Sequence, residues 1–333
     1  MPRFSSSILA TFVNKKTSYH LWLAAVACQL CSFAAPLSAS AHGFAGDRFF
    51  PATITTDDPF AASEMSLPTV TAIRTPGPPP VKDVDVSADL SVLILPNTAL
   101  TLSDGYQIQK TVDQRALTGF DNAALNLLYE FYENDKHEAI TSVGFTWEIG
   151  GTGRQSVGAD SFSRFTPISY FGKGFGDLPD QLWLLRPFAV TGELGLTIPS
   201  RADNRSLSLN PVTGQKEVTV SPNPDNLEWG FALEYSLIYL QEHVKDIGLK
   251  APFNRLIPLV EFSMQSPVNR GGGVTTGTIN PGIIWSGQYF QFGIEALIPV
   301  NSHTGHNVGV VAQMHFYLDD IFPRLFRKPL FGG

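Results

Sequence analysis

Cysteine is almost absent from this sequence. The chain holds two, at positions 28 and 31, so everything beyond residue 41 can form no disulfide and carries no thiol chemistry. Positive charge is also scarce, with 23 Lys and Arg residues against 30 Asp and Glu residues. Nucleic-acid binding needs a cluster of basic residues, so this acidic composition predicts no nucleic-acid partner.

Long apolar runs are missing as well. Beyond residue 41 no stretch offers the roughly 18 consecutive, mainly apolar residues that a membrane helix requires. The sequence therefore excludes a bundle of membrane helices.

The first 41 residues have the pattern of an export signal. They contain Arg3, Lys15 and Lys16 but no acidic residue, and an apolar stretch follows at 21–35. Ala39 to Ala41 fits the small-residue cleavage pattern, so we expect cleavage after Ala41. The alternative is an uncleaved anchor, for which the apolar stretch is short.

The rest of the chain is dominated by strand-length segments in which every second residue is apolar. In residues 83–94, apolar side chains alternate with Asp83, Asp85, Ser87, Asp89 and Ser91. Side chains alternate between the two faces of a strand, so such a strand separates an apolar medium from a wet one. Similar segments lie at 122–133, 138–149, 182–198, 227–240, 276–285, 289–300 and 308–318, and weaker ones at 101–110, 167–175 and 256–265.

This pattern predicts an all-β fold, an antiparallel transmembrane β-barrel of about ten strands, with eight to twelve possible, over residues 83–318. Residues 42–82 are irregular and rich in proline, and we expect them in the periplasm or against the barrel mouth. Residues 319–333 predict a short C-terminal tail, either interfacial or simply terminal. The soluble alternative is a β-sandwich, which shows the same alternation.

Several polar residues lie out of phase with the apolar face of their strand. In a barrel they point into the lumen, where they either pack against Arg, Gln and Tyr or form an acidic lining for cations. We favour packing, because about ten strands leave little room for a channel. The candidates are Glu130, Glu148, Glu193, Glu234, Glu261, Glu295, Gln291, Gln313 and His315. Trp147, Trp229 and Trp285 lie on apolar faces near strand ends, where interfacial aromatics are expected.

Catalytic and metal-binding patterns are weak. Ser302 and His303 are neighbours in sequence, so their side chains point apart and make a poor dyad. His303 and His306 without further ligands are more typical of a polar loop than of a metal site. We therefore predict no enzyme activity, no cofactor and no metal.

Two stretches carry a resemblance, FAGDRFFPATITTDDPFAASEMSLPTV (44–70) and VGVVAQMHFYLDDIFP (308–323). With the barrel pattern, they resemble a group of poorly characterised proteobacterial outer-membrane proteins, similar in style to barrels described as phenol-degradation-pathway or transporter proteins. The export signal and the lipid-facing alternation together predict residence in the bacterial outer membrane, with its lipids and the barrel-insertion machinery as partners. The resemblance brings no catalytic motif. One departure is that residues 319–333 follow the last strand, whereas many such barrels end on an aromatic strand residue.

The sequence predicts, as function, a passive conduit or transporter for a small, unidentified solute that could be hydrophobic or aromatic, or a structural barrel with a packed polar lumen. A lipid-modifying enzyme of the outer membrane and a soluble binding protein with a sandwich fold are the alternatives.

Overall fold

The computed structural model describes residues 43–76, 79–209 and 216–332. The predicted export signal and its cleavage site after Ala41 lie outside these residues. No helix in the described ranges is long and apolar enough to cross a membrane.

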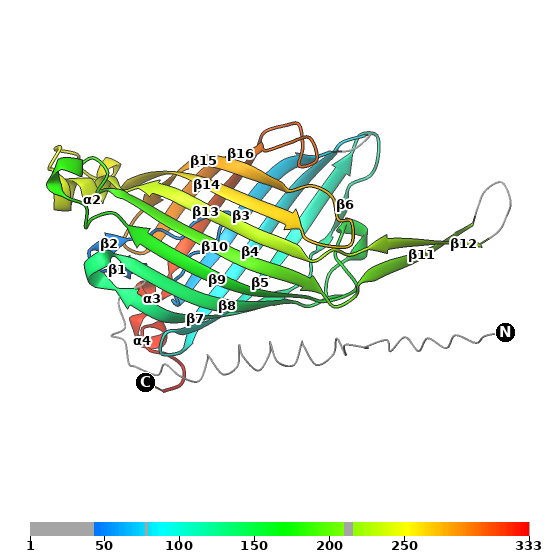
Figure 1. Ribbon diagram of the computed structural model, residues 1–333, viewed down its shortest axis with the longest axis horizontal. Helices are drawn as coiled ribbons and strands as arrows, with labels where there is room; N and C mark the ends of the chain where they lie inside the picture. Colours follow the sequence, from blue (N-terminus) through cyan, green and yellow to red (C-terminus); the bar gives the residue numbers. More distant parts are fainter. Residues whose placement is uncertain (1–42, 77–78, 210–215, 333) are drawn as a thin grey trace, which may run out of the picture. The chain divides into compact units, whose positions relative to one another are not determined.

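The strands form a closed antiparallel barrel (Figure 1). One sheet holds thirteen strands, of which twelve make the ring and the short β6 is additional. Pairing of β4 with β5 closes the ring. In the order of their pairing, the twelve are β4 (Val81–Leu95), β3 (Glu64–Thr75), β17 (Gly309–Tyr317), β16 (Phe290–Pro299), β15 (Thr276–Ser286), β14 (Leu256–Pro267), β13 (Asn226–Tyr235), β10 (Phe188–Pro199), β9 (Arg164–Gly174), β8 (Ala139–Glu148), β7 (Ala124–Asn134) and β5 (Thr98–Thr111).

The barrel therefore has twelve strands, not about ten. The strand without a sequence signal is β3, in a stretch for which the sequence predicts irregular structure. Its pairing with β4 shifts register between Ser66 and Thr69, and Pro68 lies between them. A bulge adds a residue to one strand and breaks the alternation, so the period-two pattern is lost there.

The remaining elements lie at the two ends of the ring. β6 (Leu117–Phe120) pairs with β5, β1 (Phe44–Ala45) pairs with β2 (Arg48–Phe49), and β11 (Asp203–Leu209) pairs with β12 (Lys216–Pro222) in a hairpin that projects beyond the wall (Figure 1). The helical turns are η1 (Asp135–His137), η2 (Gln155–Val157), η3 (Asp180–Leu182), α2 (Leu237–Tyr239), η4 (Leu240–Val244), η5 (Phe253–Arg255), α3 (Leu318–Ile321) and α4 (Pro323–Phe326).

We name the ends by what lies there. The terminal end is where β3 begins and β17 ends, and it carries the tight turns at 96–97 and 287–289. The hairpin end is where β10 continues into β11 and β12 returns to β13. Two longer connections, 175–187 and 236–255, also lie at the terminal end.

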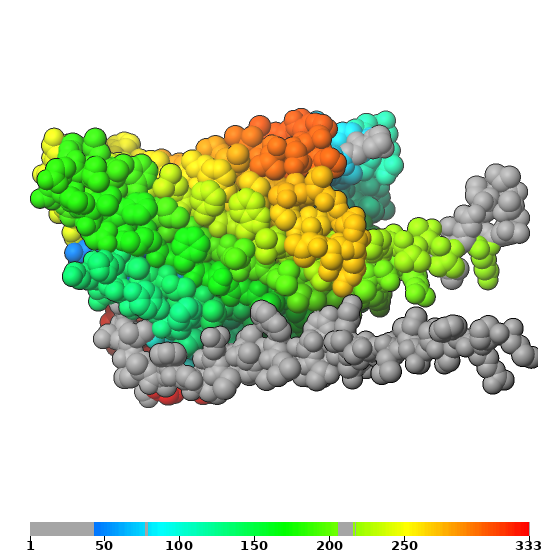
Figure 2. Space-filling view, viewed as in Figure 1, coloured from blue at the N-terminus to red at the C-terminus, as the bar shows by residue number. Residues whose placement is uncertain are grey.

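Alternation along the strands separates two faces of the wall. Large apolar side chains lie exposed on the outside, including Leu102 (51% exposed), Phe145 (46%) and Ile294 (42%). Inside, Glu261 is 0% and Glu295 1% exposed. Figure 2 shows the side chains of β8 to β15 as a continuous outer surface. Because the single sheet closes on itself with its apolar face outward, the fold excludes a sandwich, which buries that face.

The three predicted interfacial tryptophans lie near strand ends. Trp147 and Trp229 are close to the hairpin end, and Trp285 is close to the terminal end. Each indole N–H donates to an oxygen near a strand end: Ser163 Oγ (3.1 Å), Ser266 Oγ of β14 (3.2 Å) and the Pro252 carbonyl (3.1 Å), respectively. Rings with an apolar body and a satisfied polar edge suit the boundary of an apolar belt.

The outward face gives a first prediction. Ile294 lies midway along β16, opposite Ile283 and Ala312. In lipid, Ile294→Arg should lower the free energy of unfolding by about 2–4 kcal/mol, and Phe292→Arg, nearer the strand end, by less. Urea unfolding in lipid vesicles measures both. Equal midpoints for wild type and Ile294→Arg would show that this face does not meet lipid.

Candidate functional site: the lumen and its N-terminal loop

Residues 43–63 form a re-entrant loop inside the barrel, which we call the lumen loop. It starts at the terminal end with β1 and β2, reaches the interior around 54–58, and returns to begin β3. Phe50 and Phe60 of the loop pack with Ala45, Ile140 and Ala189 in a buried apolar cluster. The sequence places residues 42–82 in the periplasm or against the mouth; of these, 43–63 lie within the lumen and 64–75 form β3 of the wall.

Glu261 of β14 holds the innermost part of the lumen loop. Its carboxylate accepts the backbone N–H groups of Ile54 (2.7 Å), Thr55 (2.8 Å) and Thr56 (2.8 Å). It also accepts the hydroxyls of Thr55 (2.7 Å) and Thr56 (3.0 Å). Five hydrogen bonds from three consecutive residues thus converge on one side chain of the wall.

Two other predicted carboxylates bind the lumen loop in the same way. Glu193 accepts the N–H of Asp57 at 3.1 Å, and Glu130 accepts the N–H of Ala61 at 2.5 Å. The wall therefore supplies acceptors for backbone amides that no strand or helix satisfies.

The wall also supplies donors. Gln291 Nε2 donates to the Ala52 carbonyl at 2.5 Å, and Ser91 Oγ donates to the Ala62 carbonyl at 2.9 Å. Ser142 donates to the Pro59 carbonyl. Together with the carboxylates, these bonds hold the loop along its whole length.

The remaining predicted residues also face inward. Glu234 (2% exposed) accepts a hydrogen bond from the Thr191 hydroxyl. Glu148 accepts a hydrogen bond from Nδ2 of Asn122 and lies 3.7 Å from Arg164. Gln313 donates a hydrogen bond to the Thr69 hydroxyl. Glu295 lies against Glu261, and neither of its oxygens accepts a hydrogen bond from a described residue. Three of the six candidate carboxylates, Glu130, Glu193 and Glu261, thus bond amides of the lumen loop, and none of these three bonds a described Arg, Gln or Tyr.

Arg48 fixes the lumen loop at the terminal end. It is 0% exposed and donates to Glu138 (3.1 Å) and to the carbonyls of Pro187 (3.1 Å) and Arg186 (2.5 Å). Its guanidinium lies 3.5 Å from the ring centre of Tyr239, whose hydroxyl donates to Glu138 at 2.6 Å. Burial and the hydrogen bond to Glu138 raise the pKa of Tyr239 to about 12, so the hydroxyl keeps its proton at neutral pH.

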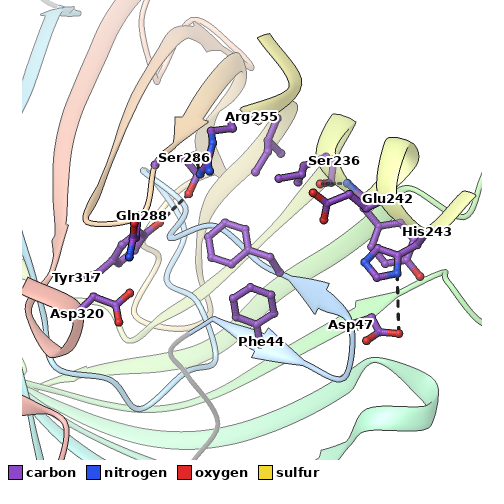
Figure 3. Close-up of a pocket in the computed structure, with 15 residues that line it drawn as sticks. Phe44, Asp47, Ser236, Glu242, His243, Arg255, Ser286, Gln288, Tyr317 and Asp320 are labelled. Atoms are coloured by element: carbon purple, nitrogen blue, oxygen red, sulfur yellow. Dashed lines mark hydrogen bonds and ion pairs between the residues drawn. The ribbon is translucent and has the colours of Figure 1, made fainter. Parts of the chain in front are cut away.

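A cavity of about 350 Å³ lies at the mouth of the terminal end (Figure 3). Phe44 and Phe49 of the β1–β2 hairpin line its floor, with ring centres 5.2 Å apart. Asp47 faces His243 across it at 4.0 Å, and Tyr317 lines the opposite side. The lumen loop separates this cavity from the interior.

Two neighbouring lumen cavities with acidic linings follow one another along β4 and β5 and share Asp89 and Ser103, and we call them the acidic path. The cavity nearer the hairpin end, about 280 Å³, is lined by Asp85, Asp89 and Asp121. The next, about 200 Å³, shares Asp89 and reaches Asp57, Asp58, Glu64 and Ala99 towards the terminal end. Among the described lining residues of both there is no Lys or Arg, and His315 is the one basic side chain.

A wider cavity lies on the hairpin-end side of the lumen loop. Its volume is about 530 Å³, and its lining includes Thr55 of the loop, Glu193, Glu228 and His303. Its described lining also holds no Lys or Arg. The cavity beside the lumen loop is therefore the smaller one, at about 200 Å³, and the cavity on the hairpin-end side of the loop is the larger one, at about 530 Å³.

The structure brings together one triad that sequence reasoning missed. Ser66 Oγ lies 2.9 Å from Nδ1 of His315, whose Nε2 lies 3.2 Å from Glu64. The order resembles a nucleophile, base and orienting acid. Asp57 and Asp89 line the same cavity, however, and their negative charge opposes the oxyanion that acyl transfer develops. Only His315 gave a signal in the sequence, because Ser66 and Glu64 belong to β3.

No described group of three or more His, Cys, Asp or Glu residues is placed to hold a metal ion. No protein-family profile and no curated protein sequence matches the chain. The resemblance to phenol-pathway barrels therefore stays a prediction.

Solved structures similar to this chain are barrels. The translocator domain of the autotransporter NalP from Neisseria meningitidis is 9% identical, with a TM-score of 0.41, over 92% of this chain and 98% of that chain. The NanC porin is 9% identical, with a TM-score of 0.40, over 75% and 97%. The outer-membrane protein OpdK from Pseudomonas aeruginosa is 10% identical, with a TM-score of 0.32, over 76% and 97%. Likenesses this distant carry no argument about function.

The contacts of Glu261 give a second prediction. Glu261→Ala leaves three buried N–H groups without their acceptor, at a cost of about 1–3 kcal/mol for each unsatisfied group. Amide hydrogen exchange at Ile54, Thr55 and Thr56 should accelerate, and the unfolding midpoint should fall. Glu228→Ala is the matched control, since Glu228 bonds Thr197 and Gln265 of the wall. Unchanged protection in Glu261→Ala would mean that the carboxylate does not hold the loop.

Proposed function

We propose that this chain is an outer-membrane β-barrel that conducts small cations slowly along the acidic path, beside a lumen loop that stays in place. The observation that carries the proposal is that two adjoining cavities, from the hairpin end towards the terminal end, are lined by carboxylates and by no described Lys or Arg.

The outer face supports the membrane part of the proposal. The strands of the ring have 9 to 15 residues, and about 9–11 tilted residues span a bilayer. Exposed apolar side chains cover the outside of the wall, and tryptophans lie near both ends. In water such a surface would associate, whereas in lipid it is the stable arrangement.

The lumen supports the cation part. Walls of low dielectric constant concentrate the field of charges inside a narrow space, so carboxylates without neighbouring cations attract cations and repel anions. Glu261, Glu193 and Glu130 are occupied by the lumen loop, so they contribute less to this field than Asp85 and Asp89. Asp57 extends the path to the innermost part of the loop, where its side chain is exposed to the lumen.

Bilayer recordings test the charge of the path. In a salt gradient, the wild-type barrel should give a small conductance with a reversal potential on the cation-selective side. Asp85→Asn/Asp89→Asn should move that potential towards zero. Asp180→Asn/Asp246→Asn removes the same charge from loops at the terminal end and should leave it unchanged. Equal selectivity in the two double variants would contradict the acidic path.

A disulfide tests whether the loop must move. A Cβ on Gly230 would lie 2.6 Å from Cγ2 of Thr56, so paired cysteines there can reach each other. In a Cys28→Ser/Cys31→Ser background, oxidised Thr56→Cys/Gly230→Cys should conduct like its reduced form. Conductance lost on oxidation and restored by reductant would show that ions pass only when the loop leaves. Each single cysteine variant is the control.

The triad of Ser66, His315 and Glu64 favours a second candidate, the lipid-modifying enzyme. We infer that it is structural, since a negative field opposes its chemistry. A fluorophosphonate probe should therefore leave Ser66 unmodified. Labelling of wild type that disappears in Ser66→Ala, while Ser103→Ala of the same cavity retains it, would favour the enzyme.

A further inference from the structure

The chain after β17 is an ordered strap rather than a loose tail. At its root, the N–H groups of Leu318 and Asp319 donate to the Ser63 carbonyl at 3.0 and 3.3 Å. At its tip, the N–H groups of Leu330 and Phe331 donate to the carbonyls of Leu93 and Ile94 of β4 at 3.0 and 2.9 Å. We call residues 318–332 the C-terminal strap.

The carbonyls of Leu93 and Ile94 can accept these hydrogen bonds because β4 extends further than β3 at the terminal end. The pairing of β3 with β4 stops at Ser91, so Leu93 and Ile94 extend past the first residue of β3. The strap therefore fills an edge that would otherwise be unpaired, beside the outward-facing end of β4. A Cβ on Gly332 would lie 3.9 Å from the Leu95 side chain, which is itself 45% exposed.

Along its length the strap exposes large apolar side chains. Phe322 is 50% exposed, Leu325 68%, Leu330 57% and Phe331 65%. Four exposed apolar residues within ten positions form a patch rather than isolated surface residues. The patch adjoins the apolar outer wall at the terminal end.

The same stretch exposes three cations, Arg324, Arg327 and Lys328. None of them forms an ion pair with a residue that the structure describes. Long basic side chains extend towards the headgroups while their neighbours enter the apolar layer. Apolar rings and free cations together match a phospholipid surface with anionic headgroups.

We propose that the C-terminal strap lies on the phospholipid headgroups of the leaflet at the terminal end, with Phe322, Leu325 and Phe331 in the boundary layer and the three cations on phosphates. This inference rests on the proposed membrane residence of the barrel. The strap then serves as a second attachment to lipid, at the rim and outside the spanning wall.

Single-cysteine labelling in the full chain, with Cys28→Ser and Cys31→Ser, tests this proposal. Leu325→Cys, Leu102→Cys on the outer wall and Val112→Cys in an exposed connection at the hairpin end each receive an environment-sensitive fluorophore. The barrels are placed in vesicles of phosphatidylethanolamine and phosphatidylglycerol that carry quenchers near the headgroup or deep in the chains. Leu325 should be quenched by the shallow lipid, Leu102 by the deep lipid, and Val112 by neither.

The cations provide the second arm. Arg324→Gln/Arg327→Gln/Lys328→Gln should lose most of the shallow quenching at Leu325, and so should replacement of phosphatidylglycerol by phosphatidylcholine. Quenching that survives both changes would overturn the assignment to anionic headgroups. A Leu325 label that behaves like Val112 while Leu102 is quenched would overturn the strap alone. Loss of quenching at Leu102 as well would overturn the membrane residence of the barrel.

Discussion

The arrangement of the lumen depends on one carboxylate, Glu261, and the backbone amides that it accepts. Without a strand or helix of its own, the innermost lumen loop has no other acceptor for three consecutive N–H groups. Glu261 lets an irregular segment occupy a polar interior, and Glu193 and Glu130 accept backbone N–H groups further along the same loop, at Asp57 and Ala61. The loop in turn screens carboxylates that would otherwise face each other across a small lumen.

Alternation predicted which side chains point inward, because the period of a strand is two whatever its partner. All nine inward candidates, from Glu130 to His315, lie on the lumen face. Alternation could not predict their partners, since Glu261 and Ile54 are 207 positions apart and their pairing depends on closure of the ring. It also missed β3, where Pro68 and a bulge interrupt the period that the prediction relied on.

The packing of carboxylates and the acidic lining are not exclusive, although the sequence analysis treats them as alternatives. The lumen loop takes the carboxylates of β7, β10 and β14. On β4 it bonds Ser91, whereas Asp85 and Asp89, further along that strand, accept no hydrogen bond from a described residue of the loop. Twelve strands make this division possible, because a smaller ring would leave no space beside the loop.

The uneven width of the lumen has an electrical consequence. A wide acidic space of about 530 Å³ lies on one side of the loop, and a narrower one of about 200 Å³ runs beside it. In the conduit proposed above, the field of the fixed carboxylates is strongest where low-dielectric walls enclose the least volume, so cations would concentrate beside the loop. The placement of one loop would then set where along the barrel the resistance to current lies.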